Sequence, residues 1–167
     1  MCIRDRFNAG QWYHLAIVGG TSSAELFVNG NHVGGFVISF GVATGSSLNL
    51  VLGNDIPLTE FFHGEMDEVR IWNKKLCQEE IMGGMNCSLN GNESGLIAYY
   101  KFNQGSAGGN NSSETTLTDS SQNNLDCTLN NFTLNGSTSN WVNSTNGVGG
   151  SCSVVECPPT HLSLIHI

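Results

Sequence analysis

The chain has 167 residues, 21 of them glycine, and its short apolar runs are separated by Asn, Ser, Thr and Gly. This length suits a single domain, and many short apolar runs between polar turns are typical of an all-β sandwich or barrel. The formal net charge of −8 argues against nucleic acid as a partner. No stretch approaches the ~20 consecutive apolar residues of a membrane span.

The sequence predicts that the two ends of the chain come from library construction and are not part of the natural protein. Residues 1–6 back-translate to ATG TGT ATA AGA GAC AGN, and the reverse complement of that string encodes the Leu-Ser-Leu-Ile-His-Ile of residues 162–167. Two unrelated termini would rarely encode both strands of one duplex, and the string resembles the transposon end used in sequencing libraries. We therefore expect a fragment in which neither hexapeptide bears on the fold. Without them, four basic residues face thirteen acidic ones, a net charge of about −9.

The first half of the chain predicts strands and one helix. Residues 11–18 have the β-branched and aromatic content of a buried strand. Residues 25–33 predict a hairpin, because Asn29-Gly30 suits a type I′ turn, which needs positive φ at both central residues. Strands are also expected at 48–52 and 65–72. A short helix is expected from about 77 to 85, with two glutamates in its first turn.

The second half is more polar. Residues 95–102 (GLIAYYKF) and 126–134 predict two strands, and the tract 103–124 between them has almost no hydrophobic residues. That tract predicts a long exposed loop. Residues 143–151 have linker composition, and the segment from Cys152 onward resembles the opening of another module.

Five blocks in the first half resemble one known family. In chain order they are Trp12–Ala16, Leu26–Gly30, Leu52–Asn54, Phe62–Asn73 and Glu79–Ile81. They are similar to the closing half of laminin G-like and pentraxin-like domains of the concanavalin A-like lectin/glucanase superfamily. The resemblance implies an antiparallel all-β jelly-roll β-sandwich, incomplete here, with one short helix after the closing strand.

The resemblance also implies a division of the chain. The C-terminal half of the jelly roll would occupy 7–86, additional strands with a long polar loop 87–142, and a linker with the start of the next module 143–161. Residues 95–141 resemble sequences that occur beside such domains in surface proteins of Bacteroidetes-type bacteria, and their start resembles the family's first strand. That strand would lie beside residues 65–72, either packing onto the half-sandwich, which we favour, or beginning a second copy.

The function implied by the resemblance is a non-catalytic extracellular recognition or adhesion module whose partner is a glycan or an extracellular protein. A structural spacer in a large surface protein is the alternative. Laminarinase-type glycoside hydrolases share this fold and use a Glu-x-Asp-x-Glu strand, in which alternate residues share a face. Here Glu65 and Asp67 are followed by Val69, so the second glutamate is missing. Glu68 would face the other way and form an exposed ion pair with Arg70, of little energetic weight.

Several residues are candidates for binding or structure. Family resemblance and hard oxygen ligands point to calcium near the loop after the Leu-Gly strand, and an ordinary polar loop is the alternative reading. Phe61 and Phe62 lie in a loop before a strand, where an outward ring could stack on a glycan. Asp67 is expected to be hydrogen-bonded and to fix its strand, with Trp12 and Trp72 in the core. The calcium ligands in that loop would be Asn54, Asp55 and Glu60.

Five cysteines remain outside the technical ends, and none has paired C-x-x-C spacing for zinc. This content favours disulfides and an extracellular or cell-surface location. Cys77 stands at the capping position of the predicted helix, where it would pair with Cys87 across that helix. Cys152 would pair locally with Cys157, which leaves Cys127 without a partner. A Cys87–Cys127 bond is an open alternative.

Overall fold

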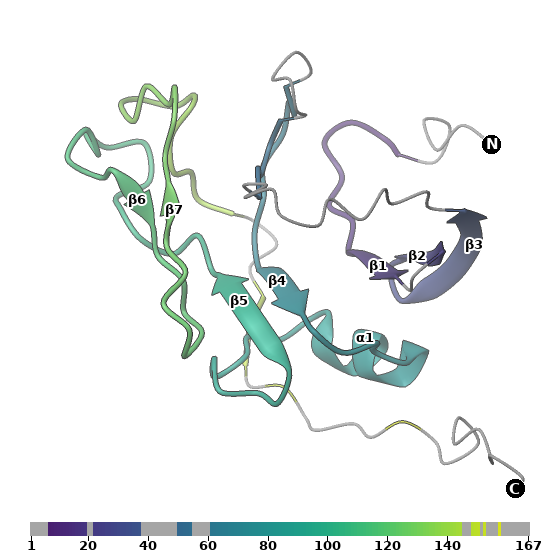
Figure 1. Cartoon of the computed structure of the whole chain (residues 1–167). Helices are drawn as coiled ribbons and strands as arrows, with labels where there is room; N and C mark the ends of the chain where they lie inside the picture. The colour runs from purple at the N-terminus through teal and green to yellow at the C-terminus, as the bar shows by residue number, and fades with distance from the viewer. Residues whose placement is uncertain are drawn as a thin grey trace, which may run out of the picture.

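The protein folds mainly into short antiparallel strands with one short helix (Figure 1). In the computed structural model, the described residues are 7–19, 22–37, 50–54, 61–144, 148–150, 152 and 157. Within them, a three-stranded sheet is followed along the chain by two two-stranded sheets. The central pair, β4 and β5, lies between the β1–β3 sheet and the β6–β7 pair in Figure 1.

The first sheet confirms the predicted hairpin. Strands β1 (Leu15–Gly19), β2 (Ser23–Val28) and β3 (Asn31–Val37) pair antiparallel in the order β1-β2-β3. Asn29 and Gly30 have φ of 50° and 76°, the positive values that a type I′ turn requires. The turn is also tied to the strand before it, because the Asn29 amide donates to the carbonyl of His14 over 2.8 Å.

Strand β4 (Val69–Trp72) pairs antiparallel with β5 (Leu96–Tyr100), as the sequence predicts for these two segments. β4 is shorter than the expected strand 65–72. Glu68 explains the difference, because its φ of 54° is in the left-handed region and ends the extended conformation. The pairing brings residues far apart in sequence side by side in the centre of the molecule.

Helix α1 (Gln78–Gly84) lies within the predicted helix and is capped by Cys77. The Cys77 amide donates to Oε2 of Glu80 over 2.9 Å, which satisfies one of the free N–H groups at the helix start. The helix contacts the β2–β3 turn, since Nε2 of Gln78 donates to the carbonyl of Gly30 over 2.9 Å. A Cβ on Gly30 would lie 2.7 Å from Cγ of Met82, so this position needs glycine for space as well as for φ.

The polar tract 103–124 is largely exposed, as its composition predicts, but part of it is buried and hydrogen-bonded to the rest of the fold. It contains β6 (Thr116–Leu117), which pairs with β7 (Cys127–Thr128). Three of its polar residues are buried: Asn111, Asp119 and Ser121. The Asp119 carboxylate accepts hydrogen bonds from the backbone N–H groups of Tyr99, Ser121 and Leu125, each over 2.8 Å. The polar side chains therefore supply backbone partners in place of a hydrophobic core.

Asn111 has the same role in the other part of this tract. Its Oδ1 accepts from the Ser106 amide over 2.7 Å, and its Nδ2 donates to the Ser106 carbonyl and to Oδ1 of Asn140. Asn140 in turn donates to the carbonyls of Gly109 and Gly136. These bonds join residues 106–111 to 136–140.

The hydrophobic core is divided into two clusters on strand β5. Tyr99, which is fully buried, packs with Leu89 and Leu96, while Ala98 and Tyr100 pack with Leu117. From Ala98 to Tyr100 the side chains alternate between the two clusters, as expected for a strand covered on both faces. Leu96 departs from this alternation beside the register shift between Ile71 and Trp72.

The disulfide pairing differs from the prediction. Cys77 is bonded to Cys157 and Cys87 to Cys152, so neither the predicted Cys77–Cys87 and Cys152–Cys157 bonds nor the alternative Cys87–Cys127 bond forms. Cys127 is a free thiol. The prediction favoured partners close in sequence, whereas Cys157 and Cys152 lie beside the two ends of helix α1 and bond to distant cysteines. The Ser88 amide donates to the carbonyl of Gly150 over 3.1 Å beside the second bond.

Candidate functional site

Two neighbouring phenylalanines form an exposed aromatic loop, which we define as Phe61 and Phe62 together with Gly53 and Asn54. Phe61 is 61% exposed and Phe62 54%. The Phe62 amide donates to the Gly53 carbonyl over 2.9 Å, and Asn54 forms a β-bridge with Phe61. The backbone beneath the rings is therefore anchored while both rings face solvent.

Gly64 shapes the aromatic loop. A Cβ on Gly64 would lie 2.8 Å from Cζ of Phe62, so the Phe62 ring lies against the glycine backbone. The sequence predicted that at least one ring would point outward, and both do. Rings held on an anchored backbone lose less conformational freedom when they bind than rings on a free loop would.

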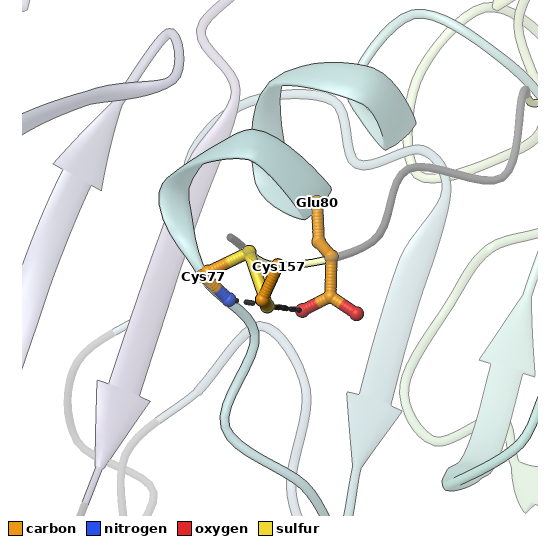
Figure 2. A group of neighbouring side chains, drawn as sticks. All are labelled: Cys77, Glu80 and Cys157. Atoms are coloured by element: carbon orange, nitrogen blue, oxygen red, sulfur yellow. Dashed lines mark hydrogen bonds between the residues drawn. A yellow bond between two sulfur atoms is a disulfide. The ribbon is translucent and has the colours of Figure 1, made fainter. Parts of the chain in front are cut away.

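The predicted calcium ligands can be placed only in part. Asn54 lies at the edge of the aromatic loop, and Asp55 and Glu60 lie outside the described residues. Within the described part of the chain, one group of His, Cys, Asp and Glu side chains is close enough to share a metal ion. It consists of Cys77, Glu80 and Cys157 (Figure 2).

That group is occupied by helix capping and by a disulfide. Cys77 and Cys157 are bonded to each other, and Glu80 accepts from the Cys77 amide and pairs with Nζ of Lys74 over 3.0 Å. Figure 2 shows the three side chains together at the first turn of α1. Disulfide sulfurs carry no charge to offer a metal, so the arrangement is a structural one in the oxidised chain.

The Glu68–Arg70 pair is largely buried, and its predicted exposure was wrong. The Arg70 and Glu68 side chains are 11% and 10% exposed, with Nη2 of Arg70 2.7 Å from Oε2 of Glu68. Glu68 also accepts from the hydroxyls of Tyr99 and Ser88, the latter over 3.2 Å. Strand β5 and the segment after α1 supply these partners, and alternation within β4 alone gives no sign of them.

Arg70 joins β4 to the end of α1. Its Nη1 donates to the Gly84 carbonyl over 2.6 Å, and its Nη2 also donates to the Cys87 carbonyl. Its guanidinium lies 5.4 Å from the centre of the Tyr99 ring. The two terminal nitrogens of Arg70 are therefore paired with a carboxylate and two carbonyls beside an aromatic face, while its Nε is buried without a partner.

The carboxylates of Glu65 and Glu68 lie in different environments. Glu65 is exposed, whereas the carboxylate of Glu68 is committed to Arg70, Tyr99 and Ser88. Burial, and then the neighbouring Glu68 charge, raise the pKa of Asp67, whose carboxyl accepts from the Glu68 backbone N–H. That bond is of the kind expected for an aspartate that fixes the backbone ahead of β4.

The two tryptophans with predicted structural roles are both partly buried. Trp72 packs against the Leu89, Leu96 and Tyr99 cluster, and Nζ of Lys74 lies 5.4 Å from the Trp72 ring centre. Trp12 lies just before β1, beside His14. Burial, and then the Arg70 charge, lower the pKa of His14, whose Nδ1 is buried without a partner.

The first half of the chain is similar to a known family. Residues 3–82 match the family model described as the concanavalin A-like lectin/glucanases superfamily, which confirms the family resemblance of the first half of the chain. No curated protein matches the chain in sequence.

One solved structure is similar to part of the chain. It is an S-layer domain-containing protein (residues 221–444) from Clostridium thermocellum, 23% identical, with a TM-score of 0.37. The match covers 46% of this chain, which spans 40% of that one. In the described part of our chain, no helix is both long and apolar enough to cross a membrane.

Proposed function

We propose that this chain is a non-catalytic, extracellular recognition module that binds carbohydrate through the aromatic loop. The exposure of Phe61 and Phe62 on an anchored backbone is the observation that carries the proposal. Sugar rings present C–H faces that pack on aromatic rings. The match to a lectin-containing superfamily supports a glycan rather than a small metabolite.

The commitment of Glu68 supports binding over hydrolysis. A retaining hydrolase needs two carboxyl groups about 5 Å apart that are free to transfer protons and attack the sugar. Glu68 is held by Arg70 and two hydroxyls, while Glu65 is exposed. The two disulfides support an oxidising, extracellular location.

Glycan-array binding of the full chain, followed by titration calorimetry on the best oligosaccharide, tests the proposal. Phe61→Ala and Phe62→Ala should each weaken binding about tenfold or more, since a stacked ring contributes its buried area and about 0.5–1.5 kcal/mol beyond it. Phe132→Ala is the matched control, because Phe132 is 52% exposed outside the aromatic loop. Equal loss in all three variants, or no glycan bound by folded protein, would favour the spacer function.

Calcium dependence is a separate part of the proposal. If Asn54, Asp55 and Glu60 hold Ca²⁺ beside the aromatic loop, chelation with EDTA should weaken glycan binding and Asp55→Asn should have the same effect. Binding that is unchanged by EDTA would remove calcium and leave the aromatic contacts in place.

A further inference from the structure

Two nested disulfides fasten Cys157 and Cys152 to the two ends of helix α1. Cys77 caps the start of the helix and is bonded to Cys157, with Cα atoms 5.8 Å apart and a sequence separation of 80. Cys87 follows the helix and is bonded to Cys152, with Cα atoms 5.0 Å apart and a separation of 65. The inner bond lies within the loop that the outer bond closes.

The outer bond divides the structure unequally. Strands β1 to β4 precede Cys77, whereas β5, β6 and β7 lie inside the closed loop. The members of both core clusters on β5, and the buried Asp119, also lie inside it. The chain enters this loop and leaves it at two Cα atoms only 5.8 Å apart.

We propose that the Cys77–Cys157 bond gives this module a mechanical function, in which tension along the chain bypasses residues 78–156. A force applied before Cys77 and after Cys157 follows the shortest covalent path, which crosses the disulfide. Once β4 has separated from β5, the loop bears none of this load, because the bond fixes its two ends whatever the force. Forced unfolding depends on the barrier along the pulled path, and the loop is outside that path.

The inner bond limits how much of the chain is released when the outer bond is reduced. If a dithiol reduces the outer bond, Cys77 and Cys157 each gain a proton and an electron as thiols, and the dithiol becomes a disulfide. The path then runs from residue 77 to 87, across the inner bond, and from 152 to 157. Only the difference between the two separations, 80 − 65 = 15 residues, is released.

Optical tweezers with handles at the two ends of the full chain test this directly. At about 3.3–3.6 Å per extended residue, Cys77→Ser/Cys157→Ser should lengthen the fully stretched chain by about 50 Å relative to wild type. Cys87→Ser/Cys152→Ser should match wild type, because the outer bond still closes the loop. Replacing all four cysteines should add about 260–290 Å, and an excess of dithiothreitol on wild type should do the same.

The stretched length reports the covalent path and not the stability, so a variant that fails to fold remains informative. The length difference between wild type and the variant without the four cysteines decides the proposal. A difference below about 100 Å would overturn it, because wild type would then already have an open loop, as with sequence-local pairs such as Cys77–Cys87. An inner-bond variant longer than wild type would also overturn it. The proposal is independent of glycan binding, and loss of glycan affinity leaves these lengths unchanged.

Discussion

The buried ion pair between Glu68 and Arg70 gives the sharpest test of how the two halves of the structure are joined. Arg70→Met removes the charge and the donors to the Gly84 and Cys87 carbonyls, while leaving an aliphatic side chain of similar length. Glu68, 10% exposed, would then be a buried carboxylate with only two hydroxyl donors. Breaking one side of a buried pair costs about 3–5 kcal/mol, so the free energy of unfolding should fall by about that amount.

Urea unfolding of the oxidised chain, followed by tryptophan fluorescence, measures this loss. Glu65→Gln is the control, since an exposed carboxylate should change stability by less than about 0.5 kcal/mol. The double variant Glu68→Leu/Arg70→Met should recover part of the loss, because it leaves no unpaired charge. A loss below about 1 kcal/mol for Arg70→Met, or no recovery in the double variant, would refute the buried-pair reasoning.

Three further perturbations test other parts of the structure. Hydrogen bonds from Tyr99 and other backbone N–H groups lower the pKa of Asp119 despite burial, so its stabilisation is present above pH 3.8 and lost as pH falls through the lower folded value. Asp119→Asn should cost about 1–3 kcal/mol at pH 7 and remove this acid dependence in urea titrations. Burial lowers the pKa of His14, so the unfolded chain binds the proton at higher pH than the folded chain, and stability should fall as pH drops below 6.5. His14→Gln should therefore reduce the change in melting temperature between pH 7 and 5. Gly30→Ala should cost about 1–2 kcal/mol in thermal melts, because φ is +76° and the new Cβ would press on Met82, whereas Gly19→Ala meets open space.

Local features of the fold could be predicted because their causes are local. Asn29-Gly30 determines its own turn, and the capping position with acidic residues after it predicts α1. The exposure of Phe61 and Phe62 also follows from their place in a loop. The family resemblance added the pairing of β4 with β5, which composition alone could not supply.

The failed predictions all depend on partners distant in sequence. Glu68 was expected at the surface because alternation says nothing of Tyr99, which covers it from β5. The cysteines were paired with near neighbours because sequence does not show that Cys152 and Cys157 lie beside α1. The buried part of the polar tract was missed because a composition rule cannot recognise Asp119 as a hydrogen-bond acceptor for three separate backbone amides.

The buried amide of Asn111 has a consequence for recombinant production. Residues 111–113 read Asn-Ser-Ser, an acceptor sequence for N-linked glycosylation in a eukaryotic secretory pathway. The Asn111 side chain already donates hydrogen bonds to Ser106 and Asn140, and the residue is 4% exposed. An oligosaccharyltransferase therefore cannot reach it in the folded chain. A sugar found on Asn111 would record modification before residues 106–111 joined 136–140, which makes its occupancy a measure of how fast this part of the chain folds during secretion.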